Sequence, residues 1–194
     1  MTKEAHNGEG ERISGWRVSA WGIALLLLVL PLVAMQFTDE VTWTGSDFVF
    51  AGCLIGGVGA VLELAVRTTP NRAYRAGVAT ALLSTFLLIW LNAAVGIIGS
   101  TDNPLNLLYG LVLVIALAGS MGTGFKARGM ARAMIAAAVA QVLVGAVAVT
   151  TGGSEPPGAL GLLVLNGFFA ALFAAAAKLF AIAARSTPVA AGKV

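Results

Sequence analysis

Six apolar stretches, each about as long as a membrane-spanning helix, follow one another along this chain with short polar breaks between them. The hydrocarbon core of a bilayer is about 30 Å thick, so a helix of roughly 20 apolar residues crosses it. The breaks contain Pro, Gly, Asn and Asp, which are typical of turns. The predicted spans are residues 16–37, 47–66, 73–99, 104–124, 130–150 and 159–184.

The composition supports the same fold class. Hydrophobic residues make up 58% of the 194 residues and charged residues only 11%, against about 25% charged residues in a soluble domain. Backbone groups that face lipid must be paired within their own segment, so each span is expected to be helical. We therefore predict an all-α, polytopic membrane bundle of six helices over residues 16–185, with short tails at 1–15 and 186–194.

The twelve Lys and Arg residues are segregated to one side of this scheme. They lie in the two tails, at the adjoining ends of the first and last spans, and in every second loop. In the other three loops, every charged residue is acidic. Because basic residues concentrate on the cytoplasmic side, both termini are predicted to be cytoplasmic, in a cell inner membrane. The loops 38–46, 100–103 and 151–158 are then predicted to lie outside.

This topology also accounts for the formal net charge of +3, so we expect no nucleic-acid partner. The expected partners are the lipid bilayer and, beyond it, other membrane proteins or further copies of this chain. The only histidine, His6, lies in the amino-terminal tail, which excludes histidine-ligated haem and zinc sites and a Ser–His nucleophile inside the membrane. We predict no catalytic residues, no metal ligands and no cofactor, and hence a protein that is not an enzyme.

Three carboxamide side chains lie well inside the predicted spans, away from the span ends, at Asn92, Gln141 and Asn166. At 1.5 Å of rise per residue, both asparagines lie roughly 10 Å below the outer surface, and Gln141 lies nearer the middle. Polar groups at this depth cost free energy unless they are paired. Two interpretations follow: an outward-facing polar cavity that binds a solute, or interhelical hydrogen bonds worth about 0.6 kcal/mol each.

Glu63 and Lys178 lie near the inner ends of the second and sixth spans, where a salt bridge would join the two helices or act as an inner gate. The alternative is local: Glu63 pairs with Arg67 one helical turn further on, and Lys178 extends to the lipid headgroups.

The loop after the third span places Ser100, Asp102 and Asn103 directly before Pro104. Their oxygen atoms would suit a bound cation. The alternative is a solvated hairpin in which Asp102 or Asn103 caps the fourth helix and Pro104 occupies its first turn. So short a turn predicts that the third and fourth helices are antiparallel neighbours.

Gly52 and Gly56 form a GxxxG pair in the second span, which predicts close packing against another helix.

The segment Leu91–Gly110 (LNAAVGIIGSTDNPLNLLYG), with residues 38–52 (TDEVTWTGSDFVFAG) and 126–134 (KARGMARAM), resembles an uncharacterised family of small multi-pass bacterial membrane proteins. That family carries a segment of the form NAAVGIIGSxDNPxNLxYG. The resemblance implies a multi-pass topology and no particular activity.

Two functions are consistent with these features. One is a small transporter or channel-like bundle with an outward-facing polar cavity. The other is a non-enzymatic accessory subunit whose Gly- and Ala-rich helix faces dock into a larger membrane complex.

Overall fold

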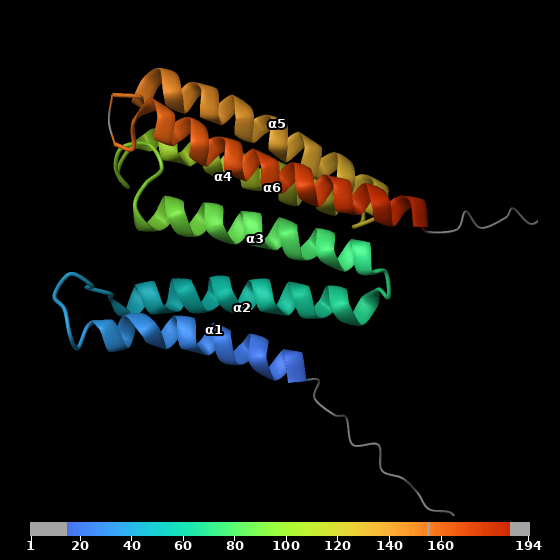
Figure 1. Ribbon diagram of the computed structural model, residues 1–194, viewed down its shortest axis with the longest axis horizontal. Helices are drawn as coiled ribbons and strands as arrows, with labels where there is room; N and C mark the ends of the chain where they lie inside the picture. The colour runs from blue at the N-terminus through green and yellow to red at the C-terminus, as the bar shows by residue number, and fades with distance from the viewer. Residues whose placement is uncertain (1–14, 155, 187–194) are drawn as a thin grey trace, which may run out of the picture. The chain divides into compact units, whose positions relative to one another are not determined.

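The computed structural model describes residues 15–154 and 156–186 and consists of long helices joined by short connections (Figure 1). Six helices in this part of the chain are long and apolar enough to cross a membrane, which confirms the predicted all-α, six-span architecture. A short 3₁₀ turn, η1 (Pro104–Asn106), precedes the fourth helix. The helices are α1 (Gly15–Ala34), α2 (Gly45–Thr68), α3 (Arg72–Ala94), α4 (Leu107–Gly122), α5 (Ala127–Gly152) and α6 (Gly158–Ser186).

The largest departure from the predicted bounds is at the end of α3, which stops at Ala94 instead of continuing to Gly99. Val95 caps the helix with its N–H directed at the last-turn carbonyls, and Gly96 follows with φ of +69°, a left-handed conformation that ends helices. Residues 95–103 therefore form a loop. The other helix ends lie within three residues of the predicted ones.

The chain divides into two compact units, the first ending at Gly59 and the second beginning at Ala60. In the first unit, α1 packs against α2 at glycines. A Cβ atom at Gly59 would lie 2.9 Å from the ring of Trp21, and one at Gly52 would lie 3.9 Å from Leu28. A Cβ at Gly56 would meet no atom within 4 Å. The close packing expected from the GxxxG pair therefore runs through Gly52 and Gly59, two helical turns apart.

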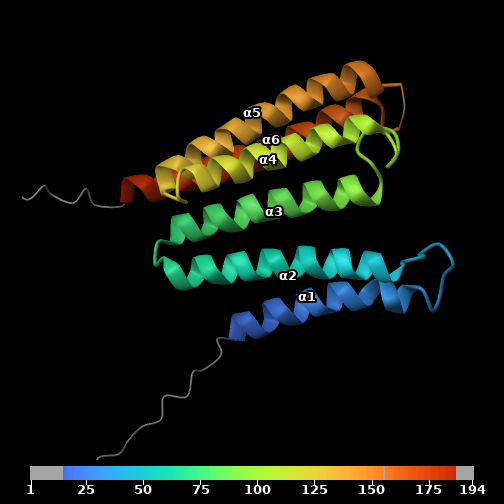
Figure 2. The same cartoon turned by 180° about the vertical axis from the view of Figure 1, so that it is seen from behind.

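In the second unit, α5 and α6 lie side by side (Figure 2), and the contact between them is the central one in the packing of α3 to α6. Helix α3 packs mainly on α6, and α4 packs mainly on α5. The expectation that α3 and α4 are each other's neighbours is therefore wrong in its main point: they run antiparallel, but they contact each other little. The physical reason is the early end of α3, because residues 95–103 and η1 make the connection long enough to separate the two helices.

Small residues bring the helices of the second unit into close contact. A Cβ at Gly119 of α4 would lie 2.8 Å from the Cβ of Ala133 on α5, and one at Gly77 of α3 would lie 3.0 Å from Phe180 on α6. Such approach gives the van der Waals contact that holds helices together in lipid. Gly77 and Gly119 therefore pack against other helices of the same chain.

Candidate functional site

Two of the three carboxamides predicted to line a cavity meet inside the bundle. Gln141 Nε2 on α5 donates a hydrogen bond of 2.8 Å to Asn166 Oδ1 on α6. Asn166 Nδ2 donates to the Leu162 carbonyl at 2.8 Å and to the hydroxyl of Tyr109 on α4 at 3.3 Å. Gln141, Tyr109 and Asn166 are only 0%, 1% and 4% exposed. We call these three side chains the amide cluster.

A glycine makes this meeting of α5 and α6 geometrically possible. Gly145 lies one turn after Gln141 on α5, so both residues face α6. A Cβ at Gly145 would lie only 2.7 Å from the Cβ of Asn166. Without a side chain at Gly145, the Asn166 side chain approaches the α5 backbone and reaches the Gln141 amide.

The amide cluster leaves one buried atom unsatisfied. Gln141 Oε1 is buried and accepts no hydrogen bond. An unpaired buried acceptor of this kind costs about 1–3 kcal/mol. Such an atom in a native structure calls for a partner, and water and bound ligands are the usual ones.

Asn92 lies outside the amide cluster, in a second polar network. Its Nδ2 donates to the main-chain carbonyl of Asn106 at 3.3 Å, and its Oδ1 is buried without a partner. The structure thus brings Gln141 and Asn166 together and places Asn92 at the α3–α4 connection.

Asn106 is a site residue that the sequence analysis missed. Its Oδ1 accepts from the Ile98 N–H at 2.9 Å, and its Nδ2 donates to the carbonyls of Ser100 at 2.7 Å and Ile98 at 3.4 Å. These bonds hold the loop inward, with Ile97 and Ile98 buried. Ile98 Cγ2 packs on Gly152 of α5, 2.5 Å from where a Cβ would lie, with Leu162 of α6 beside it.

Tyr109 was also missed. It lies one turn after Asn106, and both are polar groups within the predicted fourth span. That spacing in an apolar helix was the available signal, because it places both side chains on one face.

The three loop residues predicted as a cation site or a hairpin have separate roles. Asn103 Oδ1 accepts from the Leu105 N–H at 3.0 Å and caps η1, with Pro104 in its first turn. The hairpin alternative placed this cap on the fourth helix, but α4 begins three residues later, at Leu107. The Ser100 carbonyl accepts from Asn106 and from the Asn103 N–H, and Asp102 is exposed. In residues 15–154 and 156–186, no three His, Cys, Asp or Glu side chains form a group that would hold a metal ion.

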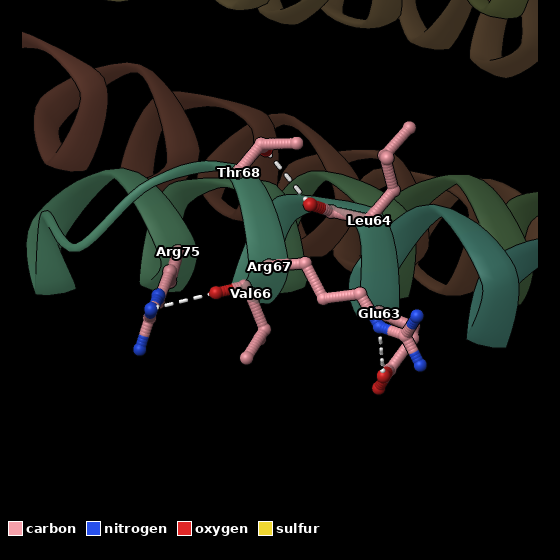
Figure 3. Close-up of polar contacts among 6 residues, drawn as sticks. All are labelled: Glu63, Leu64, Val66, Arg67, Thr68 and Arg75. Carbon is pink, nitrogen blue, oxygen red and sulfur yellow. Dashed lines mark hydrogen bonds and ion pairs between the residues drawn. The ribbon is translucent and has the colours of Figure 1, made fainter.

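Near the α2–α3 turn, Glu63 pairs with Arg67 one helical turn further on, which is the pair of the local alternative (Figure 3). Arg67 Nε lies 2.7 Å from Glu63 Oε1, with Arg67 largely exposed, and Lys178 is exposed on α6. Arg75 of α3 makes a connection that was not predicted. Its guanidinium donates to the Thr69 carbonyl at 2.6 Å and to the Val66 carbonyl in the last turn of α2 at 2.7 Å.

Replacing Arg75 by alanine is expected to lower the free energy of unfolding by about 1.5 kcal/mol, because two charge-assisted hydrogen bonds are lost. Arg72→Ala is the matched control, since Arg72 lies in the same turn and its exposed side chain makes no hydrogen bond with the described residues. The measurement is unfolding by SDS in dodecylmaltoside micelles, followed by far-ultraviolet circular dichroism. Equal stability of the two variants would show that Arg75 does not hold the turn.

A comparison of this chain with protein-family models, curated proteins and solved structures finds no match. Its function therefore has to follow from the geometry of the bundle.

Proposed function

We propose that this chain is a small transporter of an inner membrane that binds a polar solute at the amide cluster. The single observation that carries the proposal is the buried, unpaired Gln141 Oε1, which lies in the amide cluster formed by α4, α5 and α6. A solute that donates a hydrogen bond to this oxygen would recover the free energy lost by burying it. Binding sites in membrane transporters lie in the same setting, between helices near the middle of the membrane.

The surroundings of the amide cluster support a closed, solute-binding state instead of an open pore. Towards the α3–α4 loop, Ile98 and Leu162 pack beside Gly152. In the other direction along α6, Phe169 and Phe173 follow Asn166 by one and two turns, and both are fully buried. A solute would enter or leave only when one of these apolar layers moves, as alternating access requires.

The remaining buried hydroxyls support the choice of the amide cluster as the site. Ser84 donates to the Thr80 carbonyl and Ser120 to the Ala116 carbonyl, each at 2.7 Å and each within its own helix. They have an acceptor already and need no solute.

The test uses proteoliposomes and three neutral probes: water, urea and glycerol. After an osmotic jump, light scattering should show permeation of at least one probe about tenfold faster than in empty vesicles. Gln141→Leu and Asn166→Leu should reduce that rate to background, whereas Thr150→Val should not. Thr150 is a suitable control because it lies on α5, is exposed and bonds only to its own helix. Background rates for all three probes would reject the proposal.

The proposed orientation has both termini in the cytoplasm, and it rests on the segregation of Lys and Arg. With the single cysteine replaced by Cys53→Ala, we expect a membrane-impermeant maleimide to label Asp102→Cys in intact spheroplasts and Arg128→Cys only in inverted vesicles. Labelling of both positions from one side would overturn this topology.

A second candidate is a non-enzymatic accessory subunit, and one observation favours it. Cβ atoms at Gly56 and Gly57 of α2 would meet no atom within 4 Å, so this small-residue face is open to close approach by another helix. The test is detergent purification of the chain at its native expression level. A stoichiometric partner that is lost with Gly56→Leu and kept with Gly110→Leu, at an open glycine of α4, would support the accessory role. A homogeneous, partner-free protein would contradict it.

A further inference from the structure

The direction of every hydrogen bond in the amide cluster is set by one main-chain carbonyl. The Leu162 oxygen accepts only, so the Asn166 amide must present its nitrogen to it. Asn166 Oδ1 then faces Gln141, which must present Nε2. Turning either amide over would bring two oxygen atoms together without a proton between them. Gln141 Oε1 is therefore the acceptor at which this chain of hydrogen bonds ends.

The other end of the chain of hydrogen bonds is a donor. Asn166 Nδ2 donates to the Tyr109 hydroxyl, so the oxygen of that hydroxyl accepts and its hydrogen must be directed elsewhere. Among residues 15–154 and 156–186, this hydroxyl donates to no acceptor. The amide cluster thus ends in one open acceptor, Gln141 Oε1, and one open donor, the Tyr109 O–H, and both belong to side chains that are at most 1% exposed.

We infer that the amide cluster binds one hydroxyl group, which donates to Gln141 Oε1 and accepts from the Tyr109 O–H. This inference rests on the proposed function and names its solute class: a small neutral molecule with a hydroxyl group, either water or a short polyol. A carbonyl group would satisfy only Tyr109, and an ammonium group would satisfy only Gln141. The amide cluster contains no charged side chain, and an ion buried without a counter-charge is far more costly than a neutral group.

The test is a density map of the full chain in lipid nanodiscs, at a resolution that shows ordered water. We expect a peak within hydrogen-bonding distance, about 2.7–3.0 Å, of both Gln141 Oε1 and Tyr109 Oη. A compact peak without added solute identifies water, and a longer feature that appears only with glycerol identifies a polyol. An empty site, or a peak that contacts only one of the two atoms, overturns the inference.

Two substitutions of the same kind give the matched comparison. Tyr109→Phe keeps the ring and removes the open donor, so the peak should disappear. Tyr74→Phe should leave the peak in place, because the Tyr74 hydroxyl donates at 2.7 Å to the Phe125 carbonyl, in the α4–α5 turn. A peak that persists in Tyr109→Phe overturns the inference.

The permeability measurements separate this inference from the proposed function. A bridging peak with background permeability supports the hydroxyl site and rejects transport. Permeation without a bridging peak supports transport and rejects the hydroxyl site. When both hold, Tyr109→Phe should slow permeation about tenfold, which corresponds to one hydrogen bond of about 1.4 kcal/mol.

Discussion

Replacing Asn106 by alanine is expected to lower the free energy of unfolding by about 3 kcal/mol. The substitution removes three hydrogen bonds and leaves the buried Ile98 N–H without a partner, whereas the Ser100 carbonyl still accepts from the Asn103 N–H. Each unpaired buried group costs about 1–3 kcal/mol. The loss should be measurable by SDS unfolding in dodecylmaltoside micelles, followed by circular dichroism.

Asn103→Ala is the matched control for this effect. Asn103 belongs to the same connection and is the same residue type, but its side chain accepts only from the Leu105 N–H. Loss of such a cap costs about 1 kcal/mol. Equal stability of the two variants would show that the Asn106 side chain contributes no more to folding than the cap formed by Asn103.

Replacing Gly145 by valine is expected to cost about 3 kcal/mol, by overpacking the contact between α5 and α6. The new Cβ would start 2.7 Å from the Asn166 Cβ and 2.9 Å from its Cγ, so α6 must move away or Asn166 must change its rotamer. Either change breaks the hydrogen bond between Gln141 and Asn166. The same unfolding measurement applies, and any rate measured in proteoliposomes should fall in parallel.

Gly167→Val on α6 is the control. Gly167 directly follows Asn166, but a Cβ there would meet no atom within 4 Å. Its stability should therefore stay within about 0.5 kcal/mol of the wild type. A similar loss in both variants would mean that valine disturbs the helices themselves, independently of the contact at Asn166.

The helices were predictable from the sequence because their lengths and ends depend on the order of apolar and polar residues along the chain. The thickness of the hydrocarbon core sets the length of each apolar run, and polar residues mark the breaks. The end of α3 was harder to predict. Residues 95–99 are as apolar as a span, and only the left-handed backbone at Gly96 separates them from the helix.

For the candidate site, the sequence indicates how far along its helix each side chain lies, but not which neighbouring helix that side chain faces. Position along a helix gives the depth of a side chain, and on that basis Asn92, Gln141 and Asn166 were proposed together. It does not give the rotation of each helix about its own axis. Asn92 shares the predicted depth of Asn166, yet it bonds to Asn106 instead. Asn106 was missed because its partners are main-chain groups of the loop, which has no hydrophobic periodicity to reveal its path.

The central position of α5 and α6 has a consequence for biogenesis. Helices α3 and α4 are synthesised before α5 and α6, but each finds its main packing partner in the hairpin that these two later helices form. Until that hairpin has entered the lipid, α3 and α4 lack these main partners and have only a weak contact with each other. Packing of α3 is thus completed only after α6 has been synthesised, so a nascent chain that stops before α6 lacks the helix on which α3 mainly packs.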